Sequence, residues 1–391
     1  MRYGTVGIPG GNRGYKPHSV VEEAYGTLFS FFLLSEVECK LNDIGENCLM
    51  EKLDTLIKMA DGFMVSKVLF ATVKFGVYTK LSDGEKSIRE LSELLSMPER
   101  SLAKLLDVCV ALELLNKREA VYYNTPLSQQ YLVENTPDYF GYYCHSRNDM
   151  LYLEWGKLEQ YLLHDKIHTA VEGKDETTVE AVATDKDFSR RAMMAQHNYS
   201  QHPSVDFAET VDLADCKTLL DAGGGTGIFS VMAAKKFPNL KAIVFDRPFV
   251  LEVAKDIIAE HGVPEQVLLH PGDIMKNPFP EGADVVLMST ILDGYSEEDC
   301  QFMVNKVYDY LPRGGRLILI EIIINDARSG PLFPALFGLL LKMRTVGGDA
   351  RTKEEMTRWL SGAGFANIKY EKLGAFSGPY RSTGMLTAFK K

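Results

Sequence analysis

The sequence predicts an α/β protein in which a doubly wound, Rossmann-like sheet follows an N-terminal, all-helical winged-helix domain. Two observations lead to this prediction. From Met50 to Leu81, apolar residues recur at the spacing of helices with one buried face, with a break expected near Asp61 and Gly62. From Cys216 onward, short apolar runs alternate with helical segments, a pattern that produces parallel strands joined by right-handed helical crossovers.

The composition is that of an ordinary globular protein. Of the 391 residues, 46% are hydrophobic and 25% are charged, which allows two or three domains with buried cores. The net charge of −10 argues against a nucleic-acid partner, because binding to phosphates requires clustered Lys and Arg. The six cysteines show no CxxC or Cys/His spacing, which predicts a cytoplasmic protein with neither disulfides nor a metal site. The early apolar stretch TLFSFFLL is too short to span a bilayer, so we expect no membrane partner.

The first two parts of the chain are an extension and a small domain. Residues 1–50 begin with a stretch rich in Gly and Pro and are expected to form an N-terminal arm or extension. Residues 51–140 are expected to form the winged-helix domain. After its first helices come two short amphipathic helices that meet at the turn Met97-Pro98-Glu99, and then a polar hairpin before Tyr122.

A winged helix can also belong to a DNA-binding regulator. In its second short helix, however, Arg100 and Lys104 are offset by Asp107 and Glu113, so this face has no basic excess to follow a phosphate backbone. A role in dimerisation or in shaping a substrate pocket is therefore favoured.

Residues 141–212 are expected to be helical linker and substrate-pocket helices, and they are unusually rich in aromatic and Met residues. The simplest interpretation of each is a place in a core or a dimer interface. As a group they also suit an apolar pocket, with His145, His197 and His202 as its polar groups. The aromatic and Met residues are Tyr142, Tyr143, Tyr152, Trp155, Tyr161, Phe188, Met193, Met194 and Tyr199.

Residues 213–391 contain the predicted sheet. Strands are expected at TLLDAG, AIVFD, VLLHPGDI, ADVVLMST, RLILIEII and near Lys369, with helices ending near Ala234, His261 and Tyr310 and another beginning at Lys353. Ligands of such sheets bind beyond the carboxyl ends of the strands. The loops after these strands are therefore the candidate binding site.

The most specific motif is LLDAGGGTG, at the first turn from strand to helix. A dinucleotide fingerprint has the spacing Gly-x-Gly-x-x-Gly, but Ile228 stands where its third glycine would fall after Gly223 and Gly225. Asp221 also precedes the glycines, and a carboxylate there would repel a diphosphate. An acid followed by a glycine turn suits a ligand with a cationic ammonium group, of which S-adenosylmethionine is the common example.

Two further acids end the next two strands. Asp246 ends AIVFD, where a carboxylate can accept both ribose hydroxyls, and Asp273 follows in PGDIM, where an adenine amine can donate to it and Ile274 can cover the ring. Each acid alone could instead be a helix cap. Three acids at the ends of three successive strands, together with the glycine turn, favour a cofactor site.

Six motifs together resemble those of a known family. They are the glycine turn, FDRP, GDI, the loop after ADVVLMST, GGRLILIE, and GGDARTKEE before AGF. In this combination the chain resembles class I S-adenosylmethionine-dependent methyltransferases of the small-molecule O-methyltransferase family, of the caffeic acid, acetylserotonin and hydroxyneurosporene O-methyltransferase type. The resemblance covers roughly residues 55 to 391. It implies a homodimer in which the N-terminal domain exchanges helices with its partner and floors the partner's substrate pocket.

The resemblance also implies roles for individual residues, with a methyltransferase domain over residues 213–391 and no metal. Asp293 and Glu321 fall on catalytic positions, and His197 is a further candidate for the base. The implied cofactor positions are Asp221, Gly223, Gly225, Asp246, Arg247, Asp273, Ile274 and Ser289. The implied substrate positions are Trp155, Met193, Met194, Tyr295 and Met343.

The chain departs from the family pattern at its catalytic positions. Asp293 stands where the family has its catalytic histidine, in a loop that usually reads His-Asp-Trp and here reads Asp-Gly-Tyr. The related bacteriochlorophyllide C-20 methyltransferase similarly lacks this histidine. Glu321 matches a carboxylate that orients the histidine, but Ala350 stands at the position of a second carboxylate, and Ser289 replaces a lysine that helps to hold the cofactor.

Three interpretations of Asp293 are open. An unperturbed carboxylate has a pKa of about 3.9, far below about 10 for a phenol, so Asp293 needs burial or a carboxylate neighbour such as Glu321 to act as a base. Alternatively, Asp293 is not the base. In that case either the substrate ionises easily or reacts at carbon, nitrogen or sulfur, or the base is His197 or His145. In the third interpretation Asp293 is structural, although Ser296 suits the N-cap of the following helix better.

These observations predict an S-adenosylmethionine-dependent methyltransferase that acts on a small aromatic or conjugated metabolite, by O-, C- or N-methylation, in secondary-metabolite or cofactor biosynthesis. The alternative is a methyltransferase-like hydroxylase, lyase or pericyclase that binds S-adenosylmethionine without transferring its methyl group. A methyl label distinguishes them, because only the first enzyme moves it to a product.

Overall fold

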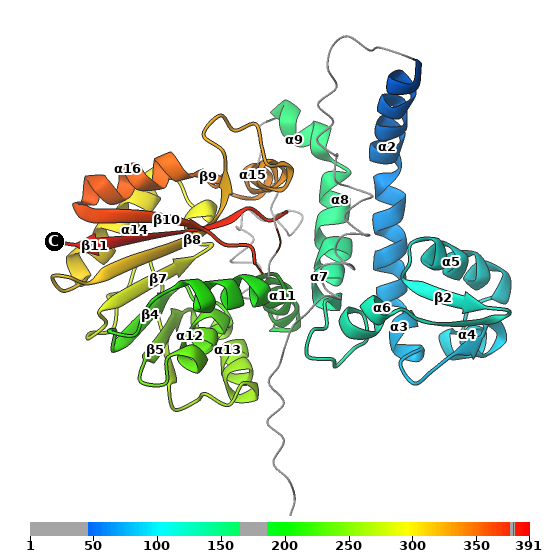
Figure 1. Cartoon of the computed structure of the whole chain (residues 1–391), viewed down its shortest axis with the longest axis horizontal. Helices are drawn as coiled ribbons and strands as arrows, with labels where there is room; N and C mark the ends of the chain where they lie inside the picture. Colours follow the sequence, from blue (N-terminus) through cyan, green and yellow to red (C-terminus); the bar gives the residue numbers. More distant parts are fainter. Residues whose placement is uncertain (1–45, 165–185, 376–377, 379) are drawn as a thin grey trace, which may run out of the picture.

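The computed structural model describes residues 46–164, 186–375, 378 and 380–391, which form two bodies connected by helices (Figure 1). The predicted N-terminal arm lies outside the described residues except for residues 46–50, which begin helix α2 (Glu46–Lys74). The boundary predicted at residue 50 therefore falls within a helix. The side chain of Phe188, named above as a pocket candidate, also lies outside the described part.

The N-terminal body is a winged helix built on α2. Its strands pair antiparallel in the order β1-β3-β2, so it contains the predicted hairpin as a small sheet beside its helices. A capping box between Ser87 and Glu90 begins α4, and α5 begins directly after Pro98, at the predicted turn. The elements after α2 are α3 (Val77–Lys80), β1 (Lys86–Ser87), α4 (Ile88–Leu95), α5 (Glu99–Ala111), β2 (Leu115–Arg118), β3 (Val121–Asn124) and α6 (Pro126–Tyr131).

Helix α2 continues without interruption through Asp61 and Gly62, so the predicted break is wrong. One glycine costs a helix only about 1 kcal/mol relative to alanine, and the packing of α2 against α5 and α7 offsets that cost. Another face of α2 carries large apolar side chains that are exposed in the single chain. They are Leu53, Leu56, Ile57, Met59, Phe63 and Met64.

A column of helices stands beside α2 and joins the two bodies (Figure 1). It consists of α7 (Gly141–Ser146), the π-helical turn η1 (Arg147–Leu151), α8 (Tyr152–Trp155) and α9 (Leu158–His164). Helix α11 (Lys186–Thr210) packs against α7 on one side and against α12 of the second body on the other. It therefore connects the N-terminal body to the sheet.

The second body is an eight-stranded sheet in the order β10-β11-β8-β7-β4-β5-β6, with the short β9 paired to β8. Strands β4 to β8 are parallel, and β10 and β11 are antiparallel, so the predicted doubly wound sheet is confirmed. The strands are β4 (Thr218–Ala222), β5 (Lys241–Asp246), β6 (Val267–Pro271), β7 (Val285–Ser289), β8 (Arg316–Ile324), β9 (Arg351–Thr352), β10 (Phe365–Lys372) and β11 (Thr383–Lys390).

Helices cover both faces of this sheet. Side chains of α11, α12 and α13 pack on one face, and side chains of α14 and α16 pack on the other, which gives two separate cores. The helices are α12 (Ile228–Lys236), α13 (Pro248–Glu260), the 3-10 turn η2 (Leu292–Gly294), α14 (Glu297–Tyr310), α15 (Leu332–Arg344) and α16 (Lys353–Ala363). Helix α15 and strand β11 were not among the predicted elements.

Three further observations concern the described residues alone. None of their helices combines the length and apolarity that crossing a bilayer requires. They hold no group of three or more Cys, His, Asp or Glu side chains suited to a metal ion. Cys109, Cys144, Cys216 and Cys300 are buried free thiols.

Candidate active site

The glycine turn after β4 brings main chain to the rim of the sheet. The Gly223 amide donates to the Phe245 carbonyl at 2.8 Å, which ties the turn to β5. Gly223 and Gly225 have φ values of +74° and +58°, in the left-handed region where a side chain is strained. A Cβ on Gly223 would also lie 2.5 Å from Ile291, whereas the space beside Gly225 is open. The turn therefore presents bare backbone to the cavity beside it.

Asp221 lies directly beneath this turn. Its Oδ2 accepts a hydrogen bond of 2.7 Å from the Ser230 hydroxyl, and its Oδ1 is buried without a hydrogen-bond partner among the described residues. Burial raises the pKa of Asp221 to about 7. A buried carboxylate oxygen without a donor suits a cationic or strongly donating ligand group at this turn.

Asp246 and Asp273 occupy the next two strand ends. Asp246 accepts a hydrogen bond from the Gly225 amide at 2.9 Å and another from the Arg247 amide at 2.7 Å. The Arg247 Nε lies 3.8 Å from a carboxylate oxygen of Asp273. Burial raises the pKa of Asp246. This edge thus offers carboxylates and an apolar residue, Ile274, in the pattern that a ribose and an adenine ring require.

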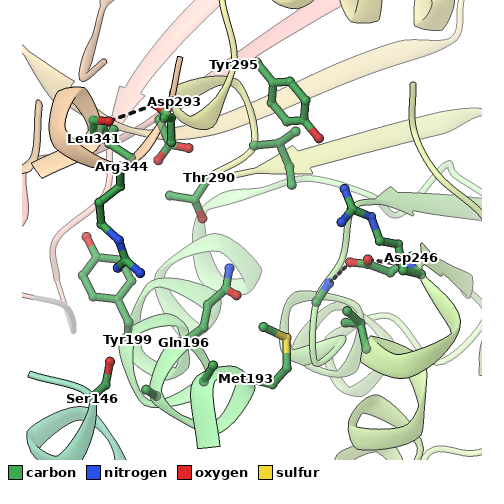
Figure 2. A pocket seen from close by; sticks show the side chains of 18 of the residues that line it. Ser146, Met193, Gln196, Tyr199, Asp246, Thr290, Asp293, Tyr295, Leu341 and Arg344 are labelled. Carbon is green, nitrogen blue, oxygen red and sulfur yellow. Dashed lines mark hydrogen bonds between the residues drawn. The ribbon is translucent and has the colours of Figure 1, made fainter. Parts of the chain in front are cut away.

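A cavity of about 470 Å³ begins at this edge and extends toward α7, α11 and α15. Figure 2 shows Asp246 on one side of the cavity and Asp293, Arg344 and Tyr199 on the opposite side. The cofactor end is lined by Gly223, Gly225, Asp246, Arg247, Asp273 and Ile274. The other end is mainly apolar and aromatic, with Tyr143, Met150, Met193, Phe333, Phe337, Leu340 and Leu341 among its lining residues.

Asp293 lies in the 3-10 turn η2 after β7 and lines this cavity, although it is only 6% exposed. Burial raises its pKa to about 7, while the Arg351 charge acts in the opposite direction. Ser296, and not Asp293, caps α14 by accepting a hydrogen bond from the Asp299 amide. Asp293 is therefore not required as a helix cap.

The turn that carries Asp293 is held from two sides. From the end of β8, the Glu321 Oε1 accepts hydrogen bonds from the Ile291 and Leu292 amides at 3.1 and 2.9 Å. From the other side, Arg351 donates to the carbonyl oxygens of Leu292, at 3.2 Å, and of Tyr295. Burial raises the pKa of Glu321, and the charge of Asp293 raises it further. Glu321 and Arg351 together fix the position of the turn that carries Asp293.

Comparison with known proteins agrees with this geometry. A family model described as the O-methyltransferase domain matches residues 155–366, and one described as the O-methyltransferase dimerisation domain matches residues 57–134. The chain belongs to the O-methyltransferase family. As a member it is an S-adenosylmethionine-dependent methyltransferase, and the carboxylates and glycine turn described above suit that cofactor.

Two curated relatives and one solved structure illustrate the similarity. The 3-hydroxy-5-methyl-1-naphthoate 3-O-methyltransferase of Streptomyces sahachiroi is 28% identical over 314 residues, 80% of this chain and 90% of the relative. The acetylserotonin O-methyltransferase of Bos taurus is 28% identical over 334 residues, 82% of this chain and 94% of the relative. The crystal structure of human N-acetylserotonin methyltransferase in complex with SAM is 26% identical, with a TM-score of 0.78, over 87% of this chain and 97% of that chain.

Seven of the predicted site residues of this methyltransferase do not line the cavity: Asp221 and Glu321, described above, and five others. One face of α11 lines the cavity with Met193, Gln196 and Tyr199, which recur at helical spacing. Met194 and His197 lie on another face of the helix and point away from the cavity. Met194 packs against the core of the sheet, and the His197 Nδ1 lies 3.0 Å from the Thr226 hydroxyl. Burial lowers the pKa of His197 to about 4, which keeps the imidazole neutral.

The other three also lie elsewhere. Met343 is buried next to Arg344 but is not among the lining residues, and the Ser289 hydroxyl is buried without a hydrogen-bond partner in the described structure. Trp155 lines a second cavity of about 610 Å³ between α2, α8 and α15. Tyr295, by contrast, lines the first cavity near the cofactor end.

Several residues that line the cavity were not predicted from the sequence. Arg147 and Ser146 lie where α7 passes into η1, and Phe333, Phe337 and Arg344 come from α15. The segment LFPALFGLLLKMR does contain a signal, because Phe333, Phe337, Leu340 and Arg344 recur at spacings of three and four. Its length and position between two strands predict a helix on this criterion.

Proposed function

We propose that this methyltransferase transfers the methyl group of S-adenosylmethionine to a hydroxyl oxygen of a small aromatic or conjugated metabolite, with Asp293 as the general base. The observation that carries the proposal is the placement of Asp293, a buried acid with a raised pKa, on the cavity wall opposite Asp246 and on the same side as Arg344 and Tyr199 (Figure 2). The relatives support it, since the enzymes from Streptomyces sahachiroi and Bos taurus are both named as O-methyltransferases.

The apolar end of the cavity supports an aromatic substrate. Tyr199 and Phe333 are stacked with ring centroids 6.2 Å apart, and Phe333 and Phe337 are stacked at 6.0 Å. All three line the cavity. Aromatic walls favour flat ring systems, which make stacking and edge contacts with them. The fold thus offers a slot for a ring and a place for its hydroxyl near Asp293.

The cofactor supplies a methyl group on a positively charged sulfur. We propose that Asp246 accepts the ribose hydroxyls, that Asp273 and Ile274 hold the adenine, and that Asp221, through the turn at Gly223 and Gly225, balances the ammonium group. The support is the line of acids along one edge and the Asp221 oxygen that has no protein donor. Arg247 and Ser289 remain cofactor proposals, Arg247 because it lines the cavity and Ser289 because its buried hydroxyl is free to bond.

In this proposal Asp293 removes the proton from the substrate hydroxyl while the ring is held against the aromatic wall. A pKa of about 7 makes Asp293 a far better match for a phenol than an ordinary carboxylate is. Glu321 does not contact the substrate, but it positions the turn by binding two amides. His197 is a weaker candidate for the base, because it pairs with Thr226 and does not line the cavity.

A methyl-labelled cofactor tests the proposal. The purified chain is incubated with labelled S-adenosylmethionine and a panel of hydroxylated aromatics, and products are analysed by mass spectrometry. We expect label on oxygen in a product and formation of S-adenosylhomocysteine. Label that remains in the cofactor while the aromatic compound is changed would support the hydroxylase, lyase or pericyclase alternative, for which none of the reported relatives provides an example.

We also propose that the enzyme works as a cytoplasmic homodimer in the biosynthesis of small metabolites. The match of residues 57–134 to a dimerisation domain supports the dimer, as do the exposed apolar side chains of α2. Large exposed apolar faces on a helix are typical of subunit interfaces.

A further inference from the structure

At the apolar end of the cavity, two buried hydrogen-bond donors lack an acceptor. The Arg344 Nη2 and the Tyr199 hydroxyl are both buried, and neither has a hydrogen-bond partner within the described structure. Both residues line the cavity (Figure 2). Arg344 is the last residue of α15, and Tyr199 lies on α11. Buried donors are nearly always bonded in native proteins, so this pair points to a ligand.

The protein's own acid does not satisfy Arg344. A carboxylate oxygen of Glu154 lies 3.6 Å from the Arg344 Nε, which is longer than a hydrogen bond. That oxygen is itself buried without a hydrogen-bond partner among described residues. Glu154 therefore offsets part of the charge of Arg344 but leaves the outer edge of the guanidinium unoccupied.

A second guanidinium makes this end of the cavity more positive. Arg147 begins the π-helical turn η1, lies 4.0 Å from the ring centroid of Tyr143, and lines both cavities. Burial lowers the pKa of Arg344, the charge of Glu154 acts in the opposite direction, and the charge of Arg147 lowers it further. A guanidinium stays protonated under such conditions. Arg147 and Arg344 thus bring two cations to this end of the cavity, where Glu154 is the acid that lies within ion-pair distance of Arg344.

We propose that Arg344, Arg147 and the Tyr199 hydroxyl bind a carboxylate on the substrate, so that the preferred substrates are hydroxylated aromatic acids. The proposal rests on the proposed function and names the substrate class of the same site. A planar carboxylate matches the fork of a guanidinium and has acceptor positions left for a hydroxyl. The acid group would lie against Arg344 while the hydroxyl of the same ring system faces Asp293.

The test compares an acid with its uncharged analogue. Binding of 6-hydroxy-2-naphthoic acid and of 6-hydroxy-2-naphthamide, with hydroxybenzoic pairs as smaller probes, is measured by isothermal titration to protein saturated with S-adenosylhomocysteine. We expect the acid to bind at least about ten-fold more tightly than the amide, as charge-assisted hydrogen bonds in a buried site provide. In Arg344→Gln the ratio should fall to about one, and Arg344→Lys should retain part of it.

Because Arg344→Gln leaves Glu154 unpaired, the double variant Arg344→Gln with Glu154→Gln is measured as well. Arg89→Gln, which removes an exposed arginine far from the cavity, is the matched control and should keep the full preference. Equal binding of acid and amide, binding of neither, or a preference that survives in the double variant would overturn the proposal. Binding of S-adenosylhomocysteine alone is measured in a separate titration. Loss of this binding would contradict the proposed function, whereas loss of the preference for the acid with this binding intact would contradict the carboxylate site alone.

Discussion

Asp293 and Asp221 are two carboxylates whose surroundings favour the protonated form, with different consequences. Asp293 reaches the cavity, so its proton is exchangeable with a substrate. Asp221 lies under the glycine turn with one oxygen bonded to Ser230 and the other unoccupied. Burial is the main cause of the raised pKa in both cases. We therefore expect the first residue to affect the rate, and the second to affect the free energy of unfolding and cofactor binding.

The rate should depend on pH through Asp293. A protonated carboxyl cannot accept a proton, so kcat should rise as pH increases through about 7, the pKa to which burial raises this residue. Initial rates with both substrates saturating, measured between about pH 4.5 and 9, test this. A profile that is already flat at a pH of about 5, near the ordinary pKa of a carboxylate, would contradict the expectation.

The buried Asp221 carboxyl should make the free energy of unfolding smaller at neutral pH than at low pH. Because its folded pKa, about 7, exceeds the value of about 3.9 in the unfolded chain, the folded state is favoured at low pH and loses stability as pH rises between these values. At about 1.4 kcal/mol per unit, the loss amounts to at most about 4 kcal/mol. Asp221→Asn should therefore raise the free energy of unfolding at pH 8 and weaken binding of S-adenosylmethionine.

Urea denaturation at a pH of about 5 and about 8, combined with cofactor titration, measures both effects. Asp256→Asn, which changes an exposed acid paired with Arg190, is the control and should alter neither. A variant that is less stable than the original at both pH values would contradict the assignment.

At the scale of single residues, the sequence was informative where strand geometry decides the position. Asp246 and Asp273 end strands, and the carboxyl ends of parallel strands meet at one edge, so their convergence was predictable. The rotation of α11 was not, because Met193 and Met194 are equally apolar and only packing decides which of them meets the sheet. His197 is a similar case, since its pairing with Thr226 depends on the position of the glycine turn.

At the scale of elements, the turn from Thr290 to Tyr295 is the part on which the site depends. Glu321 binds its amides and Arg351 binds its carbonyls, so the position of Asp293 is fixed by two neighbouring strands, β8 and β9. The Asp349 amide also donates to the Asp293 carbonyl at 2.9 Å. Each contact restrains backbone and leaves the Asp293 side chain free to act.

Arg351 should act as a positioning residue. Arg351→Met should lower kcat by about 10- to 100-fold, because displacing a reacting group by about 1 Å has an effect of that size. Since the charge of Arg351 lowers the pKa of Asp293, its removal should also move the midpoint of the pH profile upward. Because Arg351→Lys keeps the positive charge, it should return the midpoint of the pH profile toward the original value more fully than it restores kcat. An unchanged midpoint in Arg351→Met would show that the arginine has only a structural role.

Helix α15 and strand β11 were not predicted from the sequence, for a common reason. Helix α15 is apolar at most positions, so the recurrence of Phe333, Phe337, Leu340 and Arg344 at spacings of three and four is easily overlooked, although all four line the cavity. Strand β11 lies between β8 and β10 and pairs antiparallel with both. It follows β10 directly, without the helix that the alternation of strands and helices predicts. Both lie outside the repeating strand-helix pattern on which the other predictions depend.

At the scale of the whole molecule, the architecture follows from two patterns in the sequence. The alternation of apolar runs and helical segments predicted the sheet, and the short helices followed by a hairpin predicted the winged helix. The two bodies meet through α7 and α11 (Figure 1). Residues of α11, the glycine turn and α15 line the cavity. Its lining depends on that junction and could not be predicted from either pattern alone.

The apolar face of α2 should be the main part of a subunit interface. Leu56 and Met59 are 63% and 58% exposed in the single chain, and charging both should convert a dimer into a monomer. Size-exclusion chromatography with light scattering on the Leu56→Glu, Met59→Glu variant measures this. Leu268→Glu, on an exposed position of β6, is the control and should remain dimeric. A monomeric original protein, or a dimeric double variant, would contradict the assignment.

The most direct test of the central claim is the rate of methyl transfer in Asp293→Asn. Asparagine keeps the shape of the side chain but cannot accept the hydroxyl proton. We therefore expect kcat to fall by about 10²- to 10⁴-fold, the range typical of a lost general base, while the dissociation constant of S-adenosylhomocysteine stays the same. An unchanged kcat with an intact cofactor site would show that Asp293 is not the base.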